Sequence, residues 1–129
     1  MGFQPSTYAV THVVTHDDTA AAVGSGDLEV LATPRLLAWL EGASCGAVGL
    51  DAENTSVSSR VQLEHLAPSP VGAEVTATAT VVHRDGRLIR FQIVAHDVEG
   101  KVLATGEAQR IVVDRERFLS RLDQPPVGD

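Results

Sequence analysis

The feature that most constrains this chain is one helical segment with almost no polar side. Between Pro34 and Leu50 the only charged residues are Arg35, in the first turn, and Glu41, in the middle. A helix that is apolar on all sides is normally buried. We therefore expect a central helix, wrapped on most sides by the rest of the chain, with the Glu41 carboxylate inside. Its apolar residues recur at helical spacing: Leu36, Leu37, Leu40, Ala43, Ala47 and Val48.

The ends of this helix carry local signals. Thr33 is expected as the N-cap, because its hydroxyl can accept a backbone N–H, and Pro34 suits the first helical position. Gly46 and Gly49 lie near its end and favour termination there.

Most of the remaining chain predicts strands and turns. Residues 16–29 are acidic and lack periodicity, which predicts a loop or a mobile cover, and residues 51–56 predict a polar loop. Asp85-Gly86 suits the primed turn of a hairpin, and Asp114 can cap a short terminal helix. Alternating or β-branched residues predict strands over 8–15, 57–65, 73–83, 88–97 and 101–113.

In three of these strands the alternation also assigns an inner face. Side chains two residues apart point to the same side of a sheet. The expected inner residues are Val57, Ser59, Val61, Leu63 and His65, then Ala73, Val75, Ala77, Ala79 and Val81, and then Ile89, Phe91, Ile93 and Ala95.

A strand, a central helix and four antiparallel strands predict an α+β hot-dog fold, in which a curved antiparallel sheet of about five strands wraps the helix. The alternative is a cone-shaped α+β barrel, which usually has additional N-terminal helices that this sequence does not predict. The length of 129 residues suits a single domain over 1–129. We expect its core at about 8–120 and a tail over 121–129, frayed from Gln124.

Composition excludes several classes of protein. Ten basic residues against seventeen acidic ones give a net charge of −7, which argues against a nucleic-acid partner. No apolar run approaches the ~20 residues that span a bilayer, and the N-terminus lacks a basic signal-peptide start. We therefore expect a cytoplasmic protein with no membrane partner. The chain has a single cysteine, Cys45, which excludes an internal disulfide. We expect Cys45 to be an unreactive, packed residue. No His/Cys motif predicts a metal site.

Three polar residues are candidates for a chemical role because of their positions. Glu41 lies within the apolar stripe of the helix, which favours a buried functional carboxylate over a solvent-facing residue at a dimer rim. His65 shares its strand face with apolar residues and points at the helix, so that it and Glu41 could supply a base and a proton-transfer group. Thr33 places its hydroxyl at the helix N-terminus, where N–H groups favour a carbonyl oxygen or an anion.

Two runs of sequence resemble a known family. They are Leu31-Ala32-Thr33-Pro34 with Trp39-Leu40-Glu41, and the stretch Leu63–Gly72. These runs are similar to the hot-dog thioesterases of the fluoroacetyl-CoA thioesterase type. That family has a threonine at the start of the central helix, a glutamate eight residues later and a histidine on the following strand. The similarity covers roughly residues 8–120.

The resemblance implies a homodimer, or a tetramer of such dimers, that hydrolyses an acyl-CoA or acyl-carrier thioester at a site in the dimer interface. By this analogy Thr33 and Glu41 position or activate the attacking species, with Glu41 either nucleophile or base, and His65 transfers a proton. Gly72 would lie close to the thioester, and Leu37, a helical neighbour of Glu41, is assigned to substrate binding as well. Coenzyme A enters only as part of the substrate, and no other cofactor is expected.

One difference from the family concerns the segment before the helix. The fluoroacetyl-specific enzyme has a phenylalanine-bearing lid there, whereas residues 17–32 contain no aromatic residue. A different short or medium acyl group is therefore expected. Two alternatives to a thioesterase are a hot-dog hydratase or dehydratase, which usually has an Asp-His pair, and a non-catalytic module whose cavity only holds a ligand.

Overall fold

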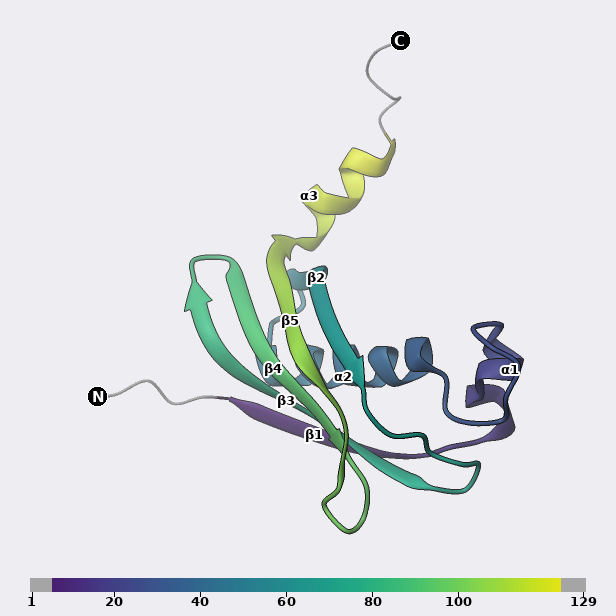
Figure 1. Cartoon of the computed structure of the whole chain (residues 1–129). Helices are drawn as coiled ribbons and strands as arrows, with labels where there is room; N and C mark the ends of the chain where they lie inside the picture. The colour runs from purple at the N-terminus through teal and green to yellow at the C-terminus, as the bar shows by residue number, and fades with distance from the viewer. Residues whose placement is uncertain (1–5, 124–129) are drawn as a thin grey trace.

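A five-stranded antiparallel sheet curves around one long helix, α2 (Thr33–Val48), in the computed structural model of the chain, which describes residues 6–123 (Figure 1). The strand order is β1-β3-β4-β5-β2, so β1 and β2 form the two edges of the sheet. This arrangement confirms the predicted α+β hot-dog fold. The strands are β1 (Thr7–Val13), β2 (Asn54–His65), β3 (Glu74–Asp85), β4 (Leu88–His96) and β5 (Val102–Asp114).

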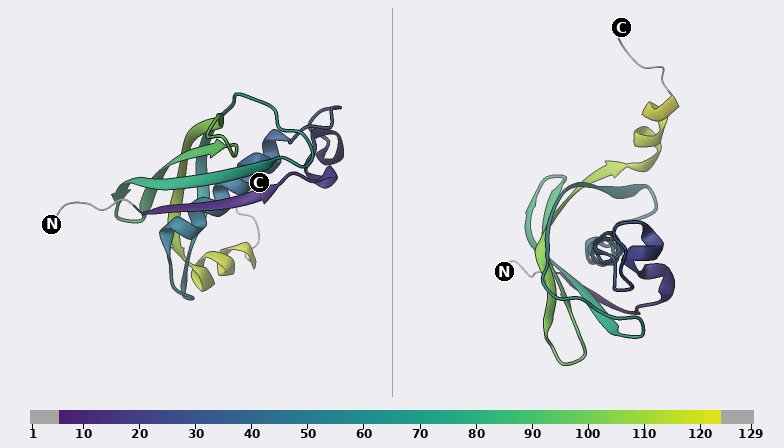
Figure 2. Two further views of the ribbon diagram at one scale, coloured as in Figure 1. Left: turned by 90° about the horizontal axis from the view of Figure 1, so that it is seen from below. Right: turned by 45° about the vertical axis from the view of Figure 1, so that its right-hand side comes forward.

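Helix α2 lies in the hollow of the curved sheet (Figure 2) and packs mainly on the inner face of β3, with smaller contacts to the neighbouring strands β1 and β4. Three of the inner side chains are alanines, Ala77, Ala79 and Ala95, which allow the helix to approach the sheet closely. The buried residues of these strands are those that the alternation predicts: Val75, Ala77, Ala79, Val81, Ile89, Phe91, Ile93 and Ala95.

Strand β2 differs from the prediction in its start and in its faces. It begins at Asn54, inside the segment for which the sequence predicts a polar loop. Its pairing with β5 shifts between Ser58 and Arg60, so that Ser59 is an extra, exposed residue in a β-bulge. Because a bulge reverses the alternation, Val57 lies on the face opposite to the predicted one. The inner face of the C-terminal half is formed by Val61, Leu63 and His65, as predicted.

The two ends of α2 agree only in part with the prediction. Ala32 is the N-cap and Thr33 is the first helical residue, so Thr33 is not the cap that the sequence predicts. The N–H of Ala32 donates to the backbone oxygen of Asp18 at 2.8 Å, and this tertiary contact fixes the entry to the helix one residue earlier. The C-terminus ends as predicted, at Gly49, which has a left-handed φ of +64°.

The β3–β4 hairpin turns one residue further along the chain than Asp85-Gly86 predicts. Asp85 pairs with Leu88, so the two central residues of the turn are Gly86 and Arg87. Gly86 has a φ of +60°, which the first central position of a primed turn requires.

The chain between β1 and α2 folds over the N-terminal end of the helix (Figure 1). It contains two short helical turns, η1 (His16–Asp18) and α1 (Ala20–Val23), which the prediction of a loop or a mobile cover did not include. Its two limbs are joined by a bridge between Thr19 and Leu31. We refer to residues 15–32 as the covering segment.

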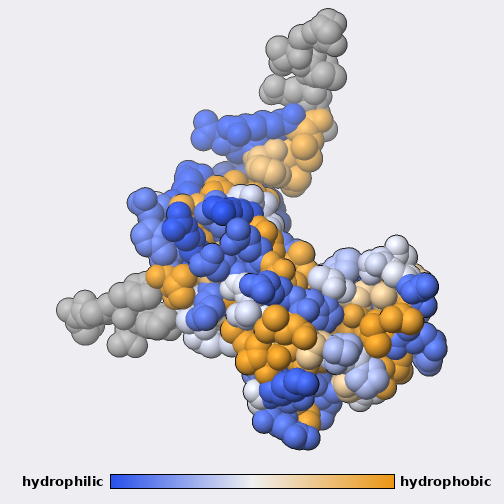
Figure 3. Space-filling view, viewed as in Figure 1, coloured by the Kyte–Doolittle hydropathy of each residue, from blue (hydrophilic) through white to orange (hydrophobic). Residues whose placement is uncertain are grey.

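The C-terminal helix α3 (Arg115–Ser120) stands away from the sheet (Figure 1) and is capped by the Asp114 side chain, as predicted. Charged and apolar side chains lie on different sides of it (Figure 3), and Leu119 is exposed. A 3-10 turn, η2 (Arg121–Asp123), follows. The frayed tail predicted from Gln124 lies outside the described residues. No helix within residues 6–123 is long and apolar enough to cross a membrane.

Gly106 of β5 allows a test of how closely β2 approaches β5. A Cβ built at Gly106 overlaps the backbone oxygen of Gln62, which no side-chain rotation can relieve. We expect Gly106→Ala to lower the free energy of unfolding by about 2 kcal/mol, measured by urea unfolding with Trp39 fluorescence.

Gly42→Ala is the matched control, because a Cβ at Gly42 meets nothing within 4 Å and the position is helical. This variant should keep its stability or gain about 0.5 kcal/mol. Equal stability of the Gly106→Ala variant and the unmodified protein would contradict the close approach of β2 and β5 at this point.

Candidate active site

Two polar side chains meet where α2 begins and β2 ends. The hydroxyl oxygen of Thr33 and Nδ1 of His65 lie 2.7 Å apart, which is hydrogen-bond distance. Thr33 is in the first turn of α2, and His65 is the last residue of β2. Of the three residues predicted to carry chemistry, these two are brought into contact by the fold.

The imidazole of His65 is half-buried. Its Nε2 is buried and has no hydrogen-bond partner among the described residues. Burial lowers the pKa of His65 below the usual value of 6.5, and the backbone of Ala67 opposes this change only in part. The ring is therefore neutral near pH 7, and a neutral imidazole has one nitrogen that can accept a proton.

An open hollow of about 310 Å³ surrounds this pair. Its walls come from the covering segment, the start of α2 and the loop that follows β2. Apart from His65, no titratable side chain among residues 6–123 lines it. Its size and apolar lining suit a small acyl group. The lining residues are Ala20, Ser25, Val30, Leu31, Thr33, His65, Leu66, Ala67 and Pro68.

The first turn of α2 supplies backbone donors beside this hollow. The first N–H groups of a helix have no partner within the helix, and the N-cap Ala32 offers no side-chain acceptor. Pro34 has no N–H, so the donors are those of Thr33 and Arg35. Together with the positive end of the helix dipole, they favour an oxygen that gains negative charge.

Glu41 does not join Thr33 and His65 within one chain. It lies eight residues further along α2, about 12 Å along the helix axis. It is half-buried, and its carboxylate has no hydrogen-bond or ion-pair partner among the described residues. The expectation of a carboxylate inside the core is therefore wrong for the single chain, because the sheet covers the opposite side of the helix.

The other predicted residues also lie outside the hollow. Leu37 is half-buried, midway between Thr33 and Glu41 on the same helix face. Gly72 is in the turn before β3, with a φ of +93° and an N–H that donates to the Val14 backbone oxygen at 2.8 Å. Cys45 is exposed rather than packed, which corrects its expected role. No group of three His, Cys, Asp or Glu side chains within residues 6–123 could hold a metal ion.

Sequence reasoning missed two features near α2 and β5. His12 of β1 stacks on Trp39 of α2, with ring centroids 4.4 Å apart and planes 2° apart. Arg110 is only 7% exposed, and its guanidinium donates to the hydroxyl and backbone oxygens of Ser56 at 2.8 and 3.0 Å. The alternation of β5 could have found Arg110, because it shares the inner face with Ala108. Nothing local predicts the stack, because its two rings are far apart in sequence.

Known proteins are similar to this chain in sequence and in fold. The family model described as a fluoroacetyl-CoA-specific thioesterase matches residues 14–116. A fluoroacetyl-CoA thioesterase from Streptantibioticus cattleyicolor is 29% identical over 103 residues, which are 78% of this chain and 73% of that protein. A solved structure of a fluoroacetyl-CoA thioesterase has a TM-score of 0.83 at 24% identity, covering 97% of this chain and 100% of that one. A hot-dog-like protein from Thermanaerovibrio acidaminovorans has a TM-score of 0.84 at 25% identity, covering 96% and 93%.

Because His65 is half-buried and its pKa is lowered, it gives a prediction of how stability depends on pH. The unfolded chain binds a proton at His65 near pH 6.5, whereas the folded chain binds it only at lower pH. The contribution is therefore complete above the unfolded pKa and is lost as the pH falls towards the lowered pKa of the folded state. We expect the Tm to fall between about pH 7.5 and 5, and to fall less steeply in the His65→Gln variant.

The control is the same substitution at the exposed His83, His83→Gln, which should follow the unmodified protein. Parallel Tm curves for the unmodified protein and the His65→Gln variant would contradict the burial of His65.

Proposed function

This chain belongs to the family of fluoroacetyl-CoA-specific thioesterases, and we propose that it carries out its reaction at Thr33 and His65. The activity is hydrolysis of an acyl-CoA thioester to a free acid and CoA. The observation that carries the proposal is the 2.7 Å contact between the Thr33 hydroxyl and His65 Nδ1, at an uncapped helix N-terminus beside a small apolar hollow. Backbone donors, a proton acceptor and a hydroxyl are the groups that cleavage of a thioester needs.

In the proposed reaction, the thioester carbonyl oxygen points at the free N–H groups of the first turn of α2. These donors stabilise the negative charge that the oxygen gains when water adds to the carbonyl carbon. The neutral His65, held by Thr33, takes up the proton that the attacking water releases. When the carbon–sulfur bond breaks, the same proton passes to the leaving thiolate of CoA.

The third residue, Glu41, is assigned to the site of a partner subunit. Thr33, Leu37 and Glu41 lie at intervals of four residues on one face of α2, which this chain leaves partly exposed. In a two-fold symmetric dimer whose axis passes near Leu37, Thr33 of each copy faces the partner's Glu41. The unpaired carboxylate of Glu41 and the long free edge of β2 support such a homodimer.

The substrate class follows from the lining of the hollow. Its residues are small or aliphatic, and the covering segment carries no aromatic ring. A short-to-medium acyl group therefore fits better than a large aromatic one. Coenzyme A is part of the substrate, and no other cofactor is required. We place the protein in the cytoplasm, where its exposed free thiol at Cys45 stays reduced.

The first test of this function is thiol release from a panel of acyl-CoA thioesters, from short to long and aromatic. We expect the fastest turnover with short chains, and a loss of about 10²–10⁴-fold in kcat for Thr33→Val, His65→Ala and Glu41→Gln. Glu64→Gln is the control, because Glu64 is exposed on the outer face of β2 beside His65. If no thioester releases a thiol but acyl-CoA still raises the melting temperature, the protein is a binding module and not a thioesterase.

A mixing experiment tests where Glu41 acts. The Glu41→Gln and His65→Ala variants are each expected to be inactive. If Glu41 acts in the partner's site, co-refolded mixtures of the two should regain about a quarter of the unmodified activity, because half of the dimers are mixed and each has one complete site. No recovery in a mixture shown to contain mixed dimers would place Glu41 in its own chain's site.

A further inference from the structure

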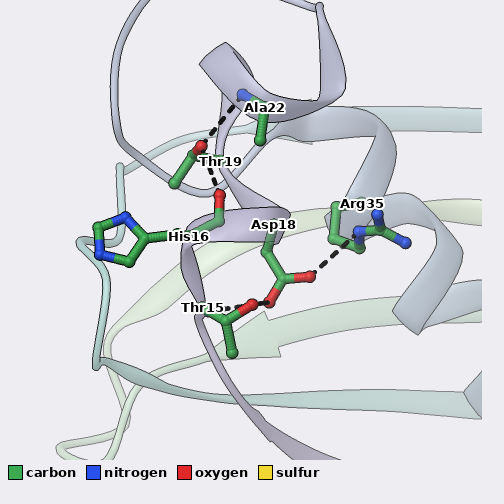
Figure 4. Close-up of polar contacts among 6 residues, drawn as sticks. All are labelled: Thr15, His16, Asp18, Thr19, Ala22 and Arg35. Atoms are coloured by element: carbon green, nitrogen blue, oxygen red, sulfur yellow. Dashed lines mark hydrogen bonds and ion pairs between the residues drawn. The ribbon is translucent and has the colours of Figure 1, made fainter.

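One carboxylate, that of Asp18, ties the covering segment to helix α2 through a side-chain ion pair. Its Oδ2 accepts hydrogen bonds from the backbone N–H and the hydroxyl of Thr15, at 2.8 and 2.9 Å. Its Oδ1 lies 3.2 Å from Nε of Arg35, in the first turn of α2 (Figure 4). Both oxygens are thus used, and the side chain of Asp18 is only 15% exposed.

The backbone around Asp18 connects this cluster to the two residues of the site. The backbone oxygen of Asp18 accepts the N–H of Ala32, the residue before Thr33, at 2.8 Å. The N–H of Leu31 donates to the backbone oxygen of Ser69, in the loop after His65, also at 2.8 Å. The C-terminal end of the covering segment, which leads into α2, is therefore fixed both to Asp18 and to the loop that follows His65.

Helix capping alone does not account for Asp18. The contact with Thr15 would close the turn of η1 without any cation. A cation in the first turn of a helix is at the unfavourable, positive end of the helix dipole. Arg35 stands there beside Pro34, and its buried Nε has no partner other than the Asp18 carboxylate among the described residues. The pair offsets that charge and ties the covering segment to the helix.

We propose that Asp18 is a positioning residue of the active site, which holds the covering segment closed through Arg35 and keeps Thr33 against His65. It touches neither the substrate nor the reacting atoms. This inference rests on the proposed function for its effect on turnover. Loss of the ion pair would let the segment move away, which exposes His65 further to water and loosens the contact between Thr33 and His65.

The test compares Asp18→Asn and Arg35→Gln with the unmodified chain. Asparagine retains an oxygen for Thr15, so Asp18→Asn removes the charge and leaves the cap. We expect kcat on a short acyl-CoA to fall by about tenfold in both variants, with KM changed less than about twofold, because small displacements of reacting groups reduce the rate steeply. The control is Glu29→Gln, which breaks the exposed ion pair with His16 in the same segment and should leave kcat unchanged.

The pKa of His65, measured by NMR titration, is a second readout that needs no turnover. Greater exposure of His65 to water should raise its pKa towards 6.5 in Asp18→Asn. Removing a negative charge by itself has the opposite sign, since it favours the neutral imidazole. Within the part of the chain that the structure describes, no other titratable side chain lines the hollow, so a rise in the pKa of His65 reports the opening of the segment.

The outcomes separate the two proposals. A raised pKa of His65 with a lower kcat supports the positioning role of Asp18. An unchanged pKa and kcat, with only a lower Tm, would show that Asp18 merely stabilises the fold. If the unmodified chain cleaves no thioester, the proposed function fails. The pKa of His65 in Asp18→Asn then still tests the role of Asp18: a raised pKa shows that Asp18 holds the segment over the histidine, and an unchanged pKa shows that it does not.

Discussion

The depth at which α2 sits in the sheet is the constraint on which the site depends. Ala77 and Ala95 face each other across β3 and β4 and are fully buried beneath the helix. Because protein interiors are close-packed, small side chains at these positions set one distance between helix and sheet. That distance places the first turn of α2 level with the end of β2, and so allows the 2.7 Å contact between Thr33 and His65. Larger residues there would lift the helix and separate the two groups.

The helix and strands could be predicted where the signal lies in the local sequence. The prediction failed where the structure depends on contacts between distant segments. Helix α2 and the inner faces of β3 and β4 follow from periodicity, because each residue's environment there is set by its own element. The bulge at Ser59 depends on how β2 pairs with β5, which no local pattern reveals. The N-cap moved from Thr33 to Ala32 for the same reason, since the backbone oxygen of Asp18 binds the Ala32 N–H.

The residues of the site could be predicted from the sequence where a polar side chain interrupts an apolar pattern. His65 stood out in that way, Thr33 stood out as the hydroxyl residue at the start of the helix, and the fold brings the two together. Asp18 did not, because an aspartate in an acidic loop is unremarkable until its partner Arg35 is known. Glu41 was found by the same pattern as His65, yet its burial was predicted wrongly. The pattern shows only that a residue's neighbours are apolar, and it cannot show that its own chain covers it.

The difference between the expected and the observed burial of α2 bears on how the protein assembles. The absence of a polar face on α2 predicts cover on all sides, but the sheet and the covering segment leave the side with Leu37 and Glu41 partly open. Exposed apolar surface along a helix is costly in water, and an unpaired carboxylate beside it gains nothing from a hydrophobic neighbour. The proposed dimer answers both points with one contact: the partner's helix covers Leu37, and each Glu41 meets the donors and the histidine of the other site. The same contact would exclude bulk water from the hollow, which keeps His65 neutral while a single bound water reacts.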